Sequence, residues 1–286
     1  PRRVVTARAT LSRDSTRPDR AAIHDRLRVE HGRARVRDRI AVWGMRLGVV
    51  TAFLLLWFAA GALHWMNPVF ISDPVSVAES LVRQLSGPIW IDVGVTLTAA
   101  LAGLALGAST GVLSGLLLGE LPRFRRAVQP VVTLANSLPR PALAPIFLVW
   151  FGLGSGAKIA VAVSVVYFLL LITPLAGVDG VDADRATLAR TLGMTRLQRF
   201  RLLQLPTAGP AIVAGLRLGS VYAVLGVVVA EMVASTEGLG LRLVEATNEF
   251  DIAGSFAILF LLALLAFALD WVVGQLQRRL SWGVAP

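Results

Sequence analysis

The sequence contains no cysteine and little of the polar chemistry from which enzymes and metal sites are built. Without cysteine, a disulfide, an iron–sulfur cluster or a thiolate metal site is excluded. The three histidines, His24, His31 and His64, are scattered and lack a partner at metal-ligand spacing. Charged residues form only 16% of the chain, against roughly 25% in an average soluble domain. We therefore expect no catalytic, metal-binding or cofactor-binding residue and no enzymatic activity in this chain.

Lysine is nearly absent as well, because Lys158 is the only one among 28 basic residues. Thirteen of the arginines lie within residues 1–46, before the first long apolar run, and the formal net charge is +10. A basic arm can bind nucleic acid, but anchoring on the cytoplasmic side of a membrane explains it as well, and we expect no nucleic-acid partner. Residues 1–42 are predicted to be an Arg-rich cytoplasmic arm, either disordered or partly a surface helix on anionic lipid.

Apolar residues, by contrast, make up 55% of the chain, more than a water-soluble fold could bury. A helix needs about 20 mostly apolar residues to cross a hydrocarbon layer about 30 Å thick, and unpaired backbone groups are not tolerated there. Six segments qualify: approximately 43–64, 94–118, 128–151, 158–177, 208–233 and 254–276. We predict an all-α membrane protein with about six transmembrane helices over residues 43–286. No cleavable signal peptide is recognisable, so the first span is expected to act as its own insertion signal.

The arginines also predict the orientation of the bundle, because cytoplasmic loops carry an excess of Lys and Arg. Besides the N-terminal arm, the basic segments are 119–127, 178–207 and the C-terminal tail. The loops 65–93 and 234–253 are mainly acidic and alternate with the basic segments. Six spans with both termini in the cytoplasm satisfy this alternation.

Small residues recur every fourth position in two of the predicted spans. Such spacing lets two helix backbones approach closely and pack by van der Waals contact. The second and fifth spans are therefore expected to pack tightly against neighbouring helices. The residues concerned are Gly103, Gly107, Gly111, Gly115, Gly119, Gly215, Gly219 and Ala223.

The most informative stretch is the basic segment between the fourth and fifth spans, which reads DADRATLARTLGMTRLQRFRLLQLPTAGP over 182–210. Asp182 and Asp184 can cap the start of a helix, and Gly193 interrupts the helical pattern that follows. A second basic stretch then leads to Pro206, where the fifth span begins. We predict a short helix, a bend at the glycine and a helix that re-enters the membrane.

This segment resembles the cytoplasmic loop of the binding-protein-dependent transport permeases. The family pattern is Glu-Ala-Ala, three residues, Gly, nine residues, and Ile-x-Leu-Pro. Five residues match it in spacing, namely Ala189, Gly193, Leu203, Leu205 and Pro206, whereas Thr187 and Leu188 stand where Glu and the first Ala are usual. The stretches 137–159, 215–231 and 238–240 also resemble the family, most of all the branch that imports nitrate, taurine and aliphatic sulfonates.

The resemblance implies the transmembrane domain of a type I ABC importer in a bacterial inner membrane. The segment 182–206 would be its coupling helix, which docks on a separate ATPase. Implied partners are two ATP-binding subunits that carry ATP and Mg, an extracytoplasmic solute-binding protein, a second permease copy that forms a homodimer, and membrane lipid. The implied coupling residues are Thr187, Leu188, Ala189, Arg190, Leu192, Gly193, Met194, Leu205 and Pro206.

One arginine lies inside the third predicted span. Arg140 stands between Pro139 and Pro141, and an ionised side chain at bilayer depth is costly unless it faces protein or water. The prolines loosen the helix, so Asn136, Ser137 and Arg140 are candidates for lining a wet path, with Arg140 a contact for an anionic solute. The alternative is that Arg140 is a structural anchor.

Isolated acids occur in the last two spans. Glu231 and Asp270 could each relay protons, and Glu231 is also a candidate for the path, or they could pair with a structural partner such as Arg217. The Gly-rich stretch 152–159 lacks the Gly-Lys-Ser/Thr ending of a phosphate loop and is expected to be a tight connection.

Two other classes of protein remain as alternatives. A secondary transporter or channel would usually show internal repeats and several mid-membrane coupling groups, and neither is visible. A membrane-embedded enzyme would need paired carboxylates or metal ligands within the spans.

Overall fold

The computed structural model describes residues 41–60, 63 and 72–280, and every regular element in these residues is a helix. The chain divides into two units, residues 1–63 and 64–286. The first unit contributes the helix Ala41–Ala60, whose 20 residues are long and apolar enough to cross a membrane. The predicted arm, residues 1–42, lies outside the described residues except for its last two positions.

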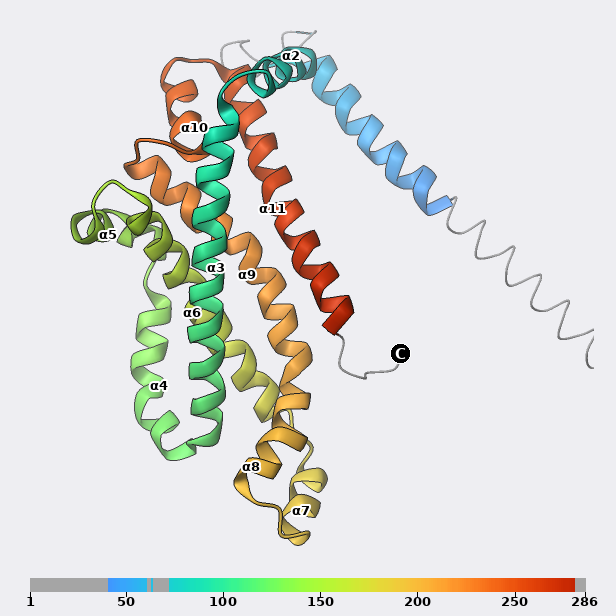
Figure 1. The fold of residues 1–286 in the computed structure, drawn as a ribbon. Helices are drawn as coiled ribbons and strands as arrows, with labels where there is room; N and C mark the ends of the chain where they lie inside the picture. The colour runs from blue at the N-terminus through green and yellow to red at the C-terminus, as the bar shows by residue number, and fades with distance from the viewer. Residues whose placement is uncertain (1–40, 61–62, 64–71, 281–286) are drawn as a thin grey trace, which may run out of the picture. The chain divides into compact units, whose positions relative to one another are not determined.

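The second unit is a bundle of long helices joined by short ones (Figure 1). Its elements in chain order are α2 (Pro74–Leu85), α3 (Ile89–Glu120), α4 (Pro122–Ser137), η1 (Arg140–Leu143), α5 (Ala144–Phe151), α6 (Ser155–Asp179), α7 (Ala183–Thr191), α8 (Arg196–Arg199), η2 (Phe200–Gln204), α9 (Leu205–Val233), α10 (Leu239–Asn248) and α11 (Ile252–Leu280). The short helices α2 and α10 lie at one end of this bundle, and α7 and α8 lie at the other (Figure 1). We refer to these as the α10 end and the α7 end.

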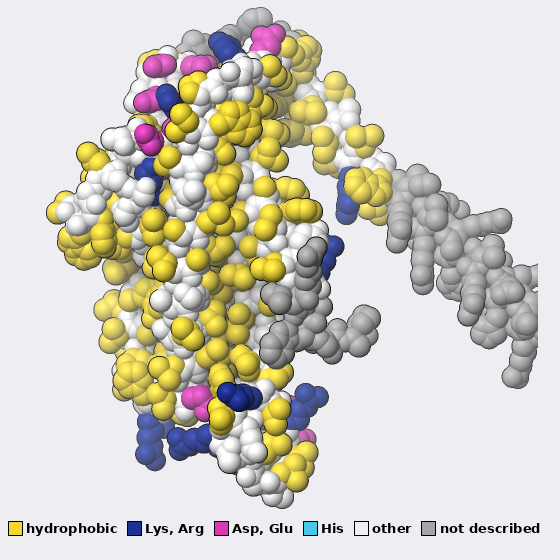
Figure 2. Space-filling model, in the orientation of Figure 1, with side chains coloured by type: hydrophobic (Ala, Val, Ile, Leu, Met, Phe, Trp, Pro, Cys, Tyr) yellow, Lys and Arg dark blue, Asp and Glu magenta, His cyan; other side chains and the backbone are white. Residues whose placement is uncertain are grey.

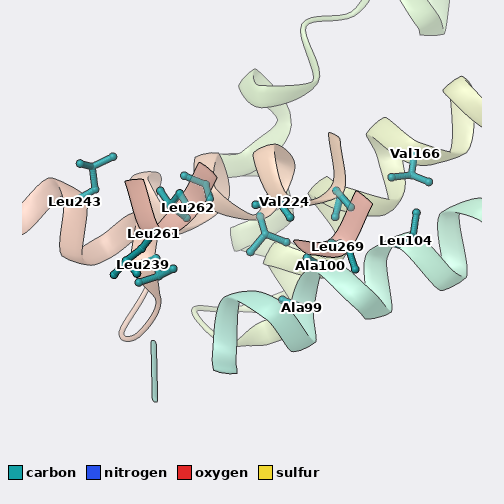
Figure 3. Packing of buried hydrophobic residues seen from close by; sticks show 14 of the residues in the cluster. Ala99, Ala100, Leu104, Val166, Val224, Leu239, Leu243, Leu261, Leu262 and Leu269 are labelled. Carbon is teal, nitrogen blue, oxygen red and sulfur yellow. The ribbon is translucent and has the colours of Figure 1, made fainter. Parts of the chain in front are cut away.

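The helices α3, α6, α9 and α11 are the four long spans of the bundle. Their shared core consists of small and branched apolar side chains, several of which Figure 3 shows facing one another from different helices. Val166, Val227 and Ala223 are among the side chains with no exposed surface. With Ala41–Ala60, the four long spans make five helices that are long and apolar enough to cross a membrane, or six if the bent α4–α5 pair is counted as one span.

The glycine stripe of α3 packs directly against the backbone of α6, as predicted. A Cβ atom added to Gly111 would lie 2.5 Å from the carbonyl oxygen of Tyr167, which is far inside van der Waals contact. In α9, a Cβ atom on Gly215 would lie 2.7 Å from Thr173 Oγ1 of α6. Glycine is needed at these positions because α6 passes too close for any side chain.

The third predicted span, 128–151, is not one continuous helix. The structure has α4 up to Ser137, then a break, and then η1 and α5, with an angle of 84° between the two parts. Leu138 is extended because Pro139 follows it, and Pro141 lacks the N–H that a continuing helix would need. The segment is therefore a broken span or a re-entrant loop.

Charged side chains are distributed unequally between the two ends of the second unit. Figure 2 shows Asp and Glu side chains mostly near α2 and α10, and Lys and Arg side chains mostly near α4, α7 and α8. Because an excess of Lys and Arg marks the cytoplasmic side, this distribution favours the α7 end as the cytoplasmic one.

Candidate functional site

The most distinctive local structure is a hairpin at the α7 end, which we call the α7–α8 hairpin (residues 182–204). Asp182 begins α7 by accepting hydrogen bonds from the backbone N–H groups of Asp184 and Arg185, at 2.9 and 3.1 Å. This satisfies two of the N–H groups that a helix start leaves unpaired. The predicted capping role of Asp182 is confirmed, whereas Asp184 lies within the first turn.

Gly193 ends α7 in a left-handed conformation with φ of 68°. Its N–H donates to the carbonyl of Arg190, and the N–H of Met194 donates to the carbonyl of Ala189, at 3.0 and 3.1 Å. These two bonds form a Schellman motif, for which glycine is the preferred residue at this position. A Cβ atom on Gly193 would meet nothing within 4 Å, so within this chain glycine is required for its conformation and not for space.

The chain then turns into α8 through a capping box. The hydroxyl of Thr195 accepts from the N–H of Gln198, and the side chain of Gln198 accepts from the N–H of Thr195. One turn of π-helix, η2, joins α8 to α9. Both turns of the hairpin are therefore held by defined hydrogen bonds.

The hairpin exposes apolar side chains. Leu188, Leu192 and Leu197 are 58%, 64% and 57% exposed. Thr187, Arg190 and Gly193 are exposed as well, Met194 is half-buried, and Ala189 is buried against the rest of the hairpin. Leu205 and Pro206 form the first turn of α9. The structure thus gathers the predicted coupling residues on one hairpin and its junction with α9.

A second feature is a groove of about 300 Å³ between α4 and α6. Asn136, Thr133 and Gln129 of α4 line it at successive helical turns, and the opposite wall is apolar except for Asp179, which pairs with Arg125. These three polar side chains are exposed. Ser137 is exposed beside them, and its hydroxyl donates to the carbonyl of Thr133.

Arg140 lies at the break between α4 and α5, where its guanidinium is already occupied. It donates to the carbonyls of Ser164 and Ala135, both at 3.1 Å, and to Asn136 Oδ1 at 3.0 Å. Its Cζ atom also lies 4.2 Å from the centre of the Phe168 ring. The arginine therefore satisfies the carbonyl of Ala135 at the end of α4 and ties the break to Ser164 of α6. Of the two roles considered for it, the geometry favours the anchor.

Glu231 is not isolated, as it is in the sequence, but lies in a buried polar cluster at the α10 end. Lys158 Nζ lies 3.2 Å from its carboxylate, and the hydroxyl of Thr96 donates to it at 3.0 Å. The N–H of Gly240 donates to the same carboxylate at 2.8 Å. Both charged side chains are almost fully buried. Sequence reasoning missed this pairing because 73 residues separate the partners.

The same cluster holds the start of α10. Asp92 of α3 accepts from the N–H of Gly238 at 2.7 Å, and Thr96 accepts from the N–H of Leu239 at 3.0 Å. Arg242 also pairs with Asp92 at 2.8 Å, and this hydrogen bond raises the pKa of Arg242 above its ordinary value. The N–H groups at the start of α10 are therefore satisfied by side chains of other helices, which ties α3, α6, α9 and α10 together.

A second intramembrane pair joins α9 to α11. Arg217 and Asp270 form a two-bond contact, at 2.7 and 3.1 Å. The sequence had offered Arg217 as a possible partner for an acid in the spans, and the structure gives it Asp270. Among the residues that the structure describes, no three His, Asp or Glu side chains are grouped so that they could hold a metal ion.

The chain is similar in sequence to a family of known proteins and to several of its members. Residues 107–282 match the model of a family described as "Binding-protein-dependent transport system inner membrane component". The taurine transport system permease protein of Escherichia coli is 30% identical over 247 residues, which is 83% of this chain and 88% of that protein.

Other relatives carry different solutes in their names. An aliphatic sulfonates transport permease protein of Bacillus subtilis is 28% identical and covers 83% of this chain and 87% of that protein. The riboflavin transport system permease protein of Chloroflexus aurantiacus is 31% identical and covers 87% and 93%. Among solved structures, the MetNI methionine ABC transporter in an inward-facing conformation has a TM-score of 0.60 at 20% identity, covering 68% of this chain and 98% of the other.

Proposed function

Because the chain belongs to the family of binding-protein-dependent transport system inner membrane components, we propose that it moves a small solute inward by alternating access, driven by a separate ATPase that grips the α7–α8 hairpin. The chain is the permease subunit of an ABC importer in the inner membrane, a transport component and not an enzyme. The proposal concerns its mechanism, its partners and its solute.

The single observation that carries the mechanism is the α7–α8 hairpin itself. It exposes Leu188 and Leu192 on a helix whose end is fixed by the Schellman motif at Gly193. Exposed leucines grouped on one short hairpin mark an interaction surface, so a partner is expected to cover them. The hairpin continues through η2 into α9, and a displacement of the hairpin would therefore be passed to a membrane span.

The partners follow from this arrangement and from the family. We propose two ATP-binding subunits at the α7 end, which bind the ATP and Mg, and an extracytoplasmic solute-binding protein at the α10 end. A second permease copy completes the path. In that dimer, ATP binding closes the ATPases, the two hairpins move together, and the path opens outward to receive the solute; hydrolysis resets it.

The solute is proposed to be a small anion such as a sulfonate, taurine or nitrate. Support comes from the relatives named for taurine and aliphatic sulfonates. Arg140 adds little support, because its guanidinium is used on backbone carbonyls. The relative named for riboflavin supplies the competing solute for the test.

For the translocation path, we propose the exposed polar face of α4. Asn136 and Ser137 were candidates from the sequence, and Gln129 and Thr133 join them because they line the groove between α4 and α6. Polar side chains at membrane depth are stable where they face water or protein. Glu231 is proposed to be structural, because its carboxylate is buried and bonded within the chain.

The test is uptake by proteoliposomes that contain the permease, its ATPase and its binding protein. We expect ATP-dependent uptake of radiolabelled taurine or another sulfonate, and none of riboflavin. Gly193→Val should abolish uptake with membrane insertion unchanged, because a branched residue does not adopt φ of 68° readily. Uptake that persists without ATP, or uptake by Gly193→Val equal to that of the unaltered permease, would point instead to a secondary transporter or channel.

A further inference from the structure

The α7–α8 hairpin contains a pocket of about 310 Å³ between the end of α6, α7 and η2. Two arginines, Arg190 and Arg199, contribute to its wall, and no wall residue is acidic. The remaining wall residues are Val178, Val181, Ala186, Leu203 and Gln204. The pocket therefore combines an apolar lining with an excess of positive charge.

Two polar atoms in this wall are buried without a hydrogen-bond partner among the described residues. They are Arg199 Nε, a donor, and Gln204 Oε1, an acceptor. Leaving such a group unsatisfied costs about 1–3 kcal/mol, and more when the group is charged. A carboxylate bound in the pocket would match the arginine, whose planar guanidinium fits it in charge and shape, whereas the Gln204 acceptor would need a separate donor.

Two acidic residues are sequence neighbours of wall residues of the pocket, and both already accept hydrogen bonds within the chain. Asp182 accepts the N–H groups that start α7, and Asp179 is held by Arg125 through two bonds of 2.7 Å. Arg190 donates to the carbonyl of Ala186, and within the described residues no salt bridge includes Arg190 or Arg199. The chain thus supplies two cations to the pocket and no counter-charge.

We propose that this pocket receives an acidic side chain, Asp or Glu, from the ATPase subunit. The inference rests on the proposed function, because it takes the ATPase to be the hairpin's partner. Thr187, which is exposed on α7, stands where the family pattern has Glu and supplies no carboxylate. In the proposed contact, the positive charges therefore lie on the permease and the negative charge lies on the ATPase.

Anionic lipid is the other source of a group that would fit two arginines, and the observations favour the ATPase. The hairpin lies at the very end of the bundle, beyond the long spans (Figure 1). Leu188 and Leu192 are exposed on the same short helix as Arg190. Exposed leucines beside arginines suit a protein partner, because protein interfaces combine apolar contact with complementary charge.

The composition of the chain provides a selective test. Its only lysine, Lys158, is buried and paired with Glu231, so an arginine-to-lysine variant introduces the only accessible lysine side chain of this sequence. A water-soluble carbodiimide then joins that amine to a carboxylate within contact distance. In the assembled transporter, we expect Arg190→Lys and Arg199→Lys to cross-link to one Asp or Glu of the ATPase subunit, identified by peptide mass spectrometry.

The matched controls are Arg185→Lys and Arg196→Lys, which place the same amine on the same hairpin outside the pocket wall. These control variants should cross-link to the ATPase subunit several-fold less than Arg190→Lys and Arg199→Lys. Equal or greater cross-linking in the controls, or none from the two pocket variants, would overturn the inference.

Charge reversal gives a second, independent measurement. The R190E/R199E variant should bind the ATPase at least about tenfold more weakly in detergent, and R185E/R196E should show a clearly smaller loss of affinity for the ATPase. Exchanging the cross-linked acid of the ATPase for arginine should restore the binding of R190E/R199E. If R190E/R199E binds the ATPase normally but no longer responds to phosphatidylglycerol vesicles, the pocket binds lipid and the inference is wrong. If the unaltered permease fails to bind the ATPase at all, the proposed function fails first.

Discussion

Replacing Lys158 with methionine should destabilise the α10 end of the bundle strongly, although the side chain is close in size and remains apolar along its length. Lys158 and Glu231 have side chains that are only 4% and 0% exposed, and their charges lie 3.2 Å apart. The substitution leaves the Glu231 carboxylate buried without its cation. It also removes the donor that Lys158 supplies to the carbonyl of Glu237, at 2.5 Å.

The expected magnitude follows from what remains around the carboxylate. Removing one partner of a buried ion pair costs about 3–5 kcal/mol. Thr96 and the N–H of Gly240 still donate to Glu231, so we expect about 3 kcal/mol, at the lower limit of that range. The double variant K158M/E231Q carries neither charge and should recover more than half of the loss. This recovery separates an uncompensated charge from a general packing defect.

The assay is unfolding in mixed micelles with increasing SDS, followed by the fluorescence of the seven tryptophans. Arg125→Met is the matched control, because it breaks an ion pair whose side chains are 26% and 55% exposed, and such pairs contribute about 0–1 kcal/mol. A loss for Lys158→Met no larger than for the control would refute the reasoning. So would a double variant less stable than either single variant.

Three further outcomes are expected from the same unfolding assay. Gly111→Val should cost about 1–3 kcal/mol, because its side chain would press into the backbone of α6, whereas Gly94→Val, with nothing within 4 Å of its added Cβ, should cost less than about 1 kcal/mol. Gly238→Ala should cost about 2 kcal/mol or more, because φ is 119° there and the added atom would overlap the buried carboxylate beneath it; a neutral result would mean that the start of α10 is not held as described. Asp73 caps α2, and its hydrogen bonds with Ser76 lower its pKa, so Asp73→Ala should cost about 1 kcal/mol at neutral pH. That difference should shrink as pH falls below about 4, through the lowered pKa of the folded state, and a difference independent of pH would exclude the carboxylate cap.

Features determined by neighbouring residues could be predicted from the sequence. The apolar lengths gave five of the membrane-spanning helices and the apolar segment that forms the bent α4–α5 pair. The four-residue spacing from Gly103 to Gly119 gave the close contact of α3 with another helix, and Asp182 and Gly193 gave the start and end of α7. Each of these depends on local hydrogen bonding or on helical periodicity, both of which a sequence displays directly.

Features determined by contacts distant in the chain could not be predicted. Glu231 and Lys158 each look isolated in the sequence, and nothing local indicates that α6 and α9 bring them together. The same holds for the occupied guanidinium of Arg140 and the bend after Ser137, where Pro139 and Pro141 indicated a loosened helix but not an 84° turn. The Gly-Leu-Gly run at 238–240 was visible as a family resemblance, but its reason, the side chains beneath α10, was not.

The cluster around Glu231 fastens four helices to one another at the α10 end, while the α7–α8 hairpin is continuous with α9 at the opposite end. Close contacts of α3 with α6 continue from Gly103 to Gly119, so these helices are also held together between the two ends. A push on the hairpin is therefore expected to turn the helices as one body. With 25 residues, α6 is about 37 Å long, so a turn of about 10° displaces one end relative to the other by about 6 Å. Motion that begins at the hairpin would thus reach the extracytoplasmic mouth without being absorbed inside the subunit.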